Sequence, residues 1–284
     1  MLDKHSLQKD FEALGIEKGD TVFLRGNIAK IGRLKPSSLF LEVLLEVIGE
    51  EGTLVTLGFS KTFPFYRVKK SYIFDKNTPS STGALAKIFM QHPLCQRSTH
   101  PSNSFLAIGK EAQSILKNHD ENALSYTPMK ALIHLNAKMI IFGIIEQSSG
   151  FTTAHYAQEV LGLTQKSWLN SLLRVYYRDS ATQEIKLFIS RDRGGCSVGF
   201  DKYYQHYLAQ GILHLGQIGK SQAMQVSAPK AYEIEHSLLS QNPSFHFCDN
   251  PLCFSCRVSW KYDLKYVVNY MILKLIVRIK GLFR

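Results

Sequence analysis

Four short stretches of the chain concentrate histidine, carboxylate, hydroxyl and arginine side chains beyond what packing requires. They span residues 25–27, 74–80, 97–104 and 152–159. Histidine is the side chain best suited to move a proton near neutral pH, and hydroxyls and arginine donate hydrogen bonds to a polar or charged ligand. Three of these stretches adjoin expected strands, and open α/β sheets bind their ligands at strand ends. The pattern therefore indicates a ligand-binding site rather than a packing surface.

Six motifs follow one another in a fixed order along most of the chain. They are Gly19-Asp20-Thr21-Val22, Gly52-Thr53-Leu54, Phe74-Asp75-x-x-Thr78-Pro79, Gly83-x-Leu85, Arg97-Ser98-x-His100-Pro101-x-x-Ser104-Phe105-x-Ala107-x-Gly109 and Thr152-x-x-His155. Each motif is weak by itself, but their shared order and spacing resemble the aminoglycoside 3-N-acetyltransferase family. The resemblance implies an α/β fold, with a mixed central sheet sandwiched by helices, and acetyl-CoA as the acyl donor.

The resemblance also implies that His155 is the general base. A neutral imidazole can take the proton of an amine as the amine attacks a thioester carbonyl. Hydroxyls and backbone amides around Ser98, Ser104 and Thr152 would then stabilise the oxyanion. The alternative is that His155 only caps or packs in a helix over 152–160. We expect direct transfer, without an acyl intermediate on Cys196, because no histidine neighbours that cysteine in the sequence.

The sequence departs from the family pattern beside His155, where that pattern continues His-x-x-Glu. Position 158 is Gln158 here, and Glu159 follows it. A glutamine can hydrogen-bond an imidazole but cannot supply the charge that stabilises an imidazolium. Glu159 lies about 100° further round a helix. We therefore expect Asp75 to orient His155, helped by Gln158 or Glu159. The alternative for Asp75 is an acceptor in the turn ahead of Thr78-Pro79.

A second departure concerns the binding cleft. Arg25-Gly26-Asn27 stands where family members usually have a His-Ser-Ser run, which alters the donor or acceptor pocket. The resemblance places the stretch 97–104 at the border of the acyl-CoA and substrate cleft. For His100 and Arg97 the alternatives are a satisfied loop histidine and an ion pair at the surface. The predicted cofactor-binding residues are Arg25, Gly26, Asn27, Arg97, Ser98, His100, Ser104 and Thr152.

The net charge of +11 bears on the acceptor. Excess positive charge favours anionic partners and attracts cationic aminoglycosides poorly. The charge is spread along the chain without a nucleic-acid-binding motif, so we expect no nucleic acid partner. We predict an acyl-CoA-dependent N-acyltransferase, with acetyl-CoA as co-substrate, acting on an amino sugar in surface glycan or polysaccharide biosynthesis. Two alternatives remain: an aminoglycoside 3-N-acetyltransferase of antibiotic resistance, and a non-catalytic sugar- or CoA-binding relative at the membrane.

The elements that would position these residues alternate between strands and helices. The order strand, loop, helix, strand over residues 21–57 is typical of a parallel α/β sheet. Residues 172–177 and 185–189 indicate an exposed hairpin, a smaller antiparallel β insertion in the C-terminal half. Periodicity and turn residues predict helices at 7–14, 37–48, 83–90, 127–133, 152–160 and 200–209, and strands at 21–24, 52–57, 105–108 and 138–143.

The composition supports one large core, because 45% of the residues are hydrophobic. We expect a single acyltransferase domain over residues 1–260 and a basic amphipathic helix over 261–284. Such a helix either lies on an anionic membrane or packs on the body or in a homodimer interface, and periodicity does not decide between these. Without a signal peptide or a run of ~18 apolar residues, we expect a cytoplasmic protein, peripheral at the inner membrane if the helix binds lipid.

The five cysteines predict reduced thiols in the cytosol, because an odd count in a chain of this length does not suggest a disulfide framework. Three of them follow a histidine within a short span. The candidate zinc ligands are therefore His246, Cys248, Cys253 and Cys256. The alternative is a set of free buried thiols that binds no metal.

Overall fold

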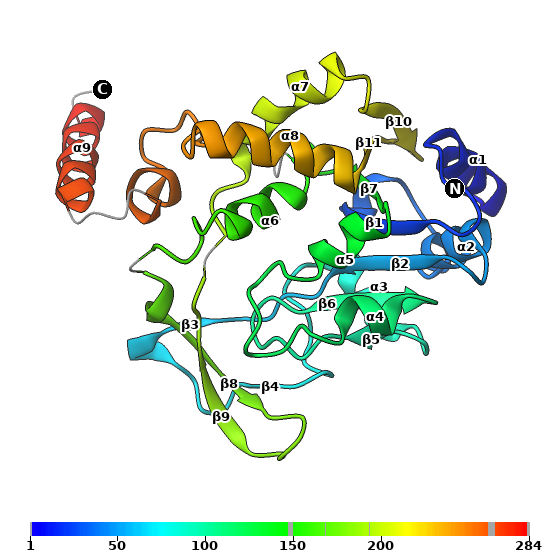
Figure 1. The fold of residues 1–284 in the computed structure, drawn as a ribbon, viewed down its shortest axis with the longest axis horizontal. Coiled ribbons are helices and arrows are strands. Elements are labelled where there is room, and N and C mark those ends of the chain that lie inside the picture. The colour runs from blue at the N-terminus through cyan, green and yellow to red at the C-terminus, as the bar shows by residue number, and fades with distance from the viewer. Residues whose placement is uncertain (1, 147–149, 168, 193, 261–264, 283–284) are drawn as a thin grey trace.

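The computed structural model describes residues 2–146, 150–167, 169–192, 194–260 and 265–282. Within them, a mixed seven-stranded sheet forms the centre of the molecule (Figure 1). β1 is parallel to both β7 and β2, and the outer strands are antiparallel to their neighbours. In spatial order the strands are β10 (His214–Ile218), β11 (Ser221–Ser227), β7 (Lys138–Phe142), β1 (Thr21–Gly26), β2 (Thr53–Leu57), β6 (Phe105–Gly109) and β5 (Gln96–Arg97).

The two faces of this sheet pack against different helices, as the predicted sandwich requires. Along β1, Val22 and Leu24 belong to one core cluster and Phe23 belongs to the other, because side chains alternate along a strand. The Val22 side packs on α1 (Lys4–Ala13), α2 (Leu39–Ile48) and α3 (Ala84–Gln91). The Phe23 side packs on α4 (Ala112–Leu116), α5 (Met129–His134), α6 (Thr153–Val160), α7 (Tyr204–Ala209) and α8 (Ala228–Gln241).

A smaller sheet lies beneath the main one in Figure 1. Its strands are β3 (Phe63–Pro64), β4 (Ile73–Phe74), β8 (Leu173–Arg178) and β9 (Ile185–Ile189), and β8 pairs with all the others. β8 and β9 form the predicted antiparallel hairpin. Short helical turns connect the larger elements: η1 (Ile28–Lys30), η2 (Phe65–Arg67), η3 (Asn170–Leu172), η4 (Val198–Tyr203) and the π-helical turn η5 (Ser255–Ser259).

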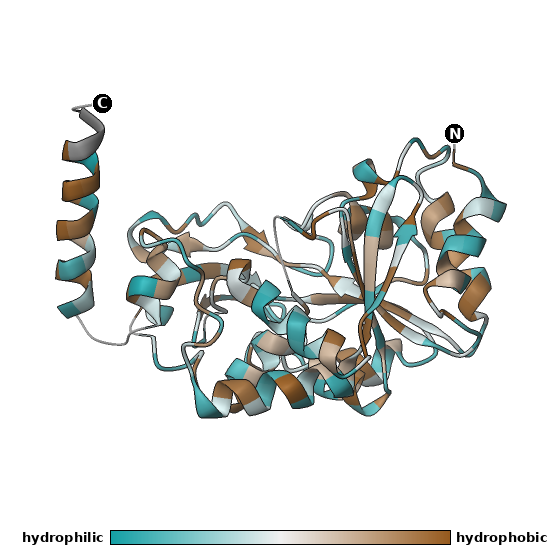
Figure 2. Cartoon of the chain, turned by 90° about the horizontal axis from the view of Figure 1, so that it is seen from above, coloured by the Kyte–Doolittle hydropathy of each residue, from teal (hydrophilic) through white to brown (hydrophobic). Residues whose placement is uncertain are grey.

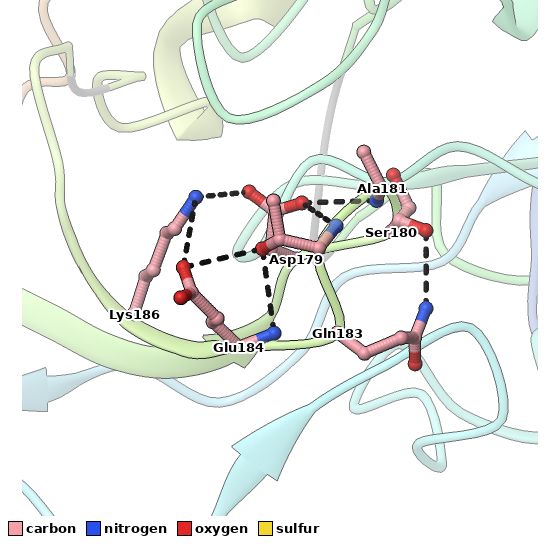
Figure 3. Close-up of polar contacts among 7 residues, drawn as sticks. Asp179, Ser180, Ala181, Gln183, Glu184 and Lys186 are labelled. Atoms are coloured by element: carbon pink, nitrogen blue, oxygen red, sulfur yellow. Dashed lines mark hydrogen bonds and ion pairs between the residues drawn. The ribbon is translucent and has the colours of Figure 1, made fainter.

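The tip of this hairpin is held by Asp179 (Figure 3). Its Oδ1 accepts hydrogen bonds from the backbone N–H groups of Ala181 and Thr182, each at 2.9 Å. Its Oδ2 accepts from the ammonium of Lys186 at 2.6 Å. This carboxylate therefore satisfies the backbone donors of the turn and pairs across the hairpin, which fixes where β9 starts.

Most predicted elements are present within a few residues of their expected bounds. The predicted helix at 200–209 is the 3₁₀ turn η4 followed by α7. No element was predicted for residues 214–241, where β10, β11 and α8 form. β10 is an edge strand with four exposed residues, and α8 buries small side chains such as Ala228 and Ala231. Both features weaken the apolar periodicity on which sequence prediction depends.

The C-terminal helix α9 (Lys265–Leu282) stands apart from the body at the left of Figures 1 and 2. A hydrogen bond connects α9 to the body: the hydroxyl of Tyr270 donates to the carbonyl of Leu252 at 3.3 Å. Apolar side chains are exposed along α9, including Val268, Met271, Ile272, Leu275 and Ile276. Among the described residues, no helix is long and apolar enough to span a bilayer. The boundary between 1–260 and 261–284 falls on residues outside the described ranges, and this division stays a prediction.

Candidate active site

His155 lies in the first turn of α6, beyond the carboxyl end of the central strand β7, which is where open α/β sheets place ligands. Two aromatic rings contact its imidazole. Tyr126 stacks on it with centroids 4.7 Å apart and planes at 18°. Phe200 lies against it at a centroid distance of 4.8 Å. Only 8% of the His155 surface is exposed. Packing therefore fixes this ring, and the His155 side chain lines neither of the two clefts described below.

A hydrogen bond sets the tautomer of this imidazole. Nδ1 of His155 lies 3.0 Å from Oε1 of Gln158, one helical turn further along α6. An amide oxygen only accepts hydrogen bonds, so Nδ1 carries the proton and Nε2 keeps its lone pair. Within the described residues no hydrogen bond occupies Nε2. This nitrogen can therefore accept a proton from a ligand.

The surroundings keep the imidazole neutral. Burial lowers the pKa of His155 to about 4; the hydrogen bond with Gln158 raises it in part, and the charge of Arg25 lowers it. An ordinary histidine titrates near pH 6.5, so the shift removes the positive charge throughout the neutral range. A neutral ring can accept a proton at Nε2, but a pKa this far below neutral makes it a weaker base than an ordinary histidine.

The three carboxylate or amide side chains predicted to orient His155 have different roles. Gln158 makes the contact. Glu159 instead accepts a hydrogen bond from the backbone N–H of Tyr126 at 2.8 Å, and burial raises the pKa of Glu159 to about 8. Asp75 is not brought to the imidazole: its Oδ1 accepts from the backbone of Asn77 at 2.8 Å within its own turn. Asp75 thus has the alternative role of a turn acceptor.

The stretch Arg25-Gly26-Asn27 lines a cleft of about 460 Å³ at the end of β1. The guanidinium of Arg25 donates to the carbonyl of Gly150 at 3.0 Å. A Cβ at Gly26 would lie 2.5 Å from the ring of Phe142, so the strand can pass here only as glycine. The cleft also meets the start of α3 at Gly83, and its other lining residues include Thr56, Leu57, Phe59, Thr82, Ala84 and Ile144. The structure therefore brings all three predicted residues into one cleft.

A second cleft, of about 240 Å³, shares one lining residue, Phe59, with the first. Tyr126 forms part of its wall and stacks on His155. Asp192 also lines it and accepts from the backbone N–H and the hydroxyl of Ser125, each at 2.9 Å. Burial raises the pKa of Asp192. The rest of the lining is rich in hydroxyl and amide groups: Ser60, Thr62, Ser81, Ser102, Asn103 and Ser190.

The residues predicted in the stretch 97–104 are bonded inside the protein. Ser98, His100 and Ser104 are each at most 2% exposed. Nδ1 of His100 accepts from the backbone N–H of Asn103 at 2.9 Å, and its ring stacks on His119. Ser98 accepts from the backbone of Phe105, while Ser104 donates to Gly58, and these bonds tie the loop to the sheet. The structure does not bring these three side chains to either cleft.

Arg97 is likewise engaged by the protein. Its guanidinium donates to the hydroxyl of Ser104 at 2.9 Å and to the carbonyls of Gly58, at 2.6 Å, and Thr78. It also lies 4.9 Å from the ring centre of Phe74. This side chain holds the loop 58–82 against β5, and an ion pair with a surface carboxylate, the alternative from sequence, is not what occupies it.

Thr152 immediately precedes α6, and its hydroxyl is buried without a hydrogen-bond partner among the described residues. An unpaired buried hydroxyl costs free energy, so a ligand oxygen would be a favourable partner. Its role in stabilising an oxyanion stays a prediction.

Three residues of this site carried no sequence signal. Tyr126 and Asp192 lie in loops and Phe200 lies in η4, and none of them belongs to one of the six motifs. Tertiary folding alone brings them next to His155 or into the wall of the smaller cleft.

The predicted zinc ligands divide in the structure. Cys248, Cys253 and Cys256 come together, and Cys196 joins them. His246 does not: its ring packs against Phe247 and Trp260 with centroids 4.9 and 4.8 Å away.

Comparisons with known proteins give a consistent result. The family model for aminoglycoside 3-N-acetyltransferase matches residues 28–240. The SPbeta prophage-derived aminoglycoside N(3′)-acetyltransferase-like protein YokD of Bacillus subtilis is 28% identical over 135 residues, which are 41% of this chain and 50% of that protein. The chain thus matches about half the length of this curated relative.

Solved structures of similar fold cover more of the chain. The apoenzyme of aminoglycoside acetyltransferase AAC(3)-IVa superimposes with a TM-score of 0.74 at 16% identity, covering 92% of this chain and 97% of that one. A structure described as AAC-IIIb binary with CoASH gives a TM-score of 0.70 at 18% identity, covering 84% and 97%. At these identities the superpositions show a common fold.

Proposed function

The chain belongs to the aminoglycoside 3-N-acetyltransferase family, and from this premise we propose that it transfers the acetyl group of acetyl-CoA to an amine of an aminoglycoside-type amino sugar. The observation that carries the proposal is the imidazole of His155, neutral, with Nδ1 bonded to Gln158 and Nε2 available. A relative of the same fold has been solved with CoASH, which supports acetyl-CoA as the donor.

The two clefts would hold the two substrates. The larger one, of about 460 Å³ and lined in part by Arg25, would hold the pantetheine arm, and the arginine supplies a positive charge for an anionic donor. The smaller one, walled by Tyr126 and Asp192, would hold the acceptor. Phe59 lines both clefts, and Tyr126 in the wall of the smaller one stacks on His155, whose own side chain lines neither cleft. The transfer would require the thioester and the amine to meet beside these rings.

The reaction needs one proton transfer in which His155 takes part. The amine nitrogen attacks the thioester carbonyl, and Nε2 of His155 takes the proton that the nitrogen loses. The new amide C–N bond forms as the C–S bond breaks, and the proton passes to the departing CoA thiolate or to water. The hydroxyl of Thr152, which lacks a protein partner among the described residues, would donate to the transient oxyanion.

A second candidate, an amino sugar of a surface glycan, is favoured by the charge of the smaller cleft. Asp192 is the one carboxylate in that lining among the described residues, whereas hydroxyl and amide groups are plentiful. Such a wall suits an acceptor with many hydroxyls and few ammonium groups. It suits a polycationic antibiotic less well.

Measuring CoA release from acetyl-CoA with a panel of acceptors tests both candidates. The panel would contain sisomicin, a mono-amino sugar, a UDP-linked amino sugar, and UDP-glucose as the control without an amine. We expect release with at least one amine acceptor and none with UDP-glucose. Release confined to sisomicin would reject the glycan candidate. If none of the amine acceptors caused CoA release, the acetyltransferase proposal would be rejected, and the protein would be a non-catalytic sugar- or CoA-binding protein.

For α9 we propose peripheral contact with an anionic membrane. Its exposed apolar side chains alternate with Lys265, Lys274 and Arg278, the composition of helices that lie at lipid surfaces. We expect the full chain to sediment with phosphatidylglycerol vesicles and not with phosphatidylcholine vesicles. The double substitution Lys274→Glu with Arg278→Glu should abolish the binding. A dimer in solution without vesicle binding would instead assign the helix to an interface between two copies.

A further inference from the structure

Four cysteines from two distant parts of the chain converge beside the active-site wall. The Sγ atoms of Cys196, Cys248, Cys253 and Cys256 all lie within 4.8 Å of one another. In a tetrahedral zinc site with Zn–S bonds of about 2.3 Å, neighbouring sulfurs are about 3.8 Å apart. The cluster is therefore already close to the dimensions of a zinc centre. We propose that these four thiolates bind a structural zinc ion.

The ligand set differs from the one that the sequence predicts, because Cys196 takes the place of His246. His246 is fully buried, and neither of its ring nitrogens has a hydrogen-bond partner among the described residues. Its ring is enclosed by Phe200, Phe247 and Trp260. Cys196, which is 52 positions before Cys248 in the chain, supplies the fourth sulfur instead.

The donor set favours zinc in a structural role. Cys253-x-x-Cys256 is the close spacing that zinc-binding turns use, and the other two ligands come from separate loops. Four thiolates fill a tetrahedron completely and leave no position for water or substrate, which is the pattern of structural rather than catalytic zinc. Pairing into two disulfides would not require all four sulfurs to lie mutually close.

Two cationic side chains bind the backbone of the loop that supplies Cys248. Zinc with four thiolates carries a net charge of about −2. The guanidinium of Arg257 donates to the carbonyl of Cys248 at 2.6 Å. The ammonium of Lys202 donates to the carbonyl of Phe247 at 2.6 Å. Lys202 also forms an ion pair with Asp249 at 2.9 Å, so Arg257 is the cation that would offset the negative centre.

The cluster also has a mechanical task. It occupies a small apolar core of its own with Leu163, Phe247 and Trp260. A core of this size needs a staple to be stable by itself. The staple joins the segment 248–256 to the loop just before η4. At Gly199 in η4 a Cβ would lie 2.4 Å from the carbonyl oxygen of His246, so the two segments touch backbone to backbone.

One residue further along η4 is Phe200, which packs on the imidazole of His155. The zinc ion would therefore hold the wall of the candidate active site in place without contacting any ligand in the clefts. The inference stands on the cysteine geometry and does not depend on the proposed acetyl transfer.

Metal analysis of the full-length protein tests the proposal. Protein expressed with added zinc and purified under reducing conditions without chelator should contain about one zinc per chain by plasma mass spectrometry. Replacing the zinc by Co²⁺ should give the intense visible spectrum of tetrahedral cobalt thiolate. We expect Cys196→Ser and Cys256→Ser each to lose the metal and to lower the melting temperature. The control Cys95→Ser, at a cysteine outside the cluster, should keep both.

His246→Phe separates the two ligand sets, and we expect it to retain zinc. Loss of zinc in His246→Phe together with retention in Cys196→Ser would overturn the assignment of ligands. Should the cluster variants not fold, the unaltered protein still decides. Zinc-free protein after refolding with excess zinc, iron in place of zinc, or disulfides found among the four cysteines would each overturn the proposal.

Discussion

Replacing His155 by alanine should lower kcat about 100-fold or more and leave the affinity for acetyl-CoA nearly unchanged. The imidazole would accept the amine proton at Nε2, and nothing else among the described residues offers a neutral base at that position. Calorimetric titration with acetyl-CoA, beside steady-state rates, measures the two effects separately. His134→Ala is the matched control, since that histidine is exposed on α5 away from the clefts. Wild-type turnover in His155→Ala would remove the mechanism.

The pH dependence gives an independent check on the same residue. Because the pKa of His155 is lowered to about 4, the ring stays neutral from neutral pH down to mild acid, and protonation removes the base only near pH 4. A carboxylate at position 158 would stabilise the imidazolium and raise that pKa. In Gln158→Glu we therefore expect the acid limb of kcat to move to higher pH, and NMR titration of the ring to show the same direction. An unmoved limb in both measurements would mean that residue 158 does not govern the imidazole.

Replacing Phe200 by alanine should lower the free energy of unfolding by about 3–5 kcal/mol. The side chain is fully buried and lies against His155, Tyr203 and His246, so its removal leaves a cavity between the His155 ring and the C-terminal segment. Denaturant unfolding measures the loss. Water entering the cavity would also relieve the burial of the imidazole, and the pKa of His155 should rise.

Phe200→Leu is the matched control for that substitution. It keeps an apolar side chain of moderate size, and we expect it to cost less than about 1.5 kcal/mol. Equal stabilities of the alanine variant and the unaltered protein would show that Phe200 does not support this wall.

The sequence predicted the parts of the site that depend on neighbours along the chain. His155 and Gln158 are three residues apart, and helical geometry alone places them on one face of α6. Arg25-Gly26-Asn27 lines a cleft at the end of β1, where a strand end of an α/β sheet suggests a ligand, and its role in binding stays a prediction. The preference for Asp75 over Gln158 came from the charge that an imidazolium would need. The structure instead keeps the imidazole neutral by burial, so an amide suffices.

The remaining differences arise from contacts between distant segments. The hydroxyls of Ser98 and Ser104 look the same in sequence whether they meet a ligand or a backbone carbonyl. Here the paired strands β5 and β6 turn them inward, where they satisfy the loop. Cys196 and Phe200 have these contacts only because the segment 246–260 packs against η4. Local periodicity in the sequence does not predict such a long-range contact.

The hydrogen bond between Glu159 and the backbone of Tyr126 constrains which mutations this chain can accept during evolution. Two successive residues of α6 hold the two stacked rings: Gln158 hydrogen-bonds the imidazole of His155, and Glu159 hydrogen-bonds the backbone of Tyr126. A substitution at position 158 or 159 alters one of these two hydrogen bonds and leaves the other in place. A single inserted or deleted residue between 155 and 159 would rotate the rest of the helix by about 100° and break both hydrogen bonds together. This five-residue stretch should therefore accept exchanges of side chains across evolution while its length stays constant.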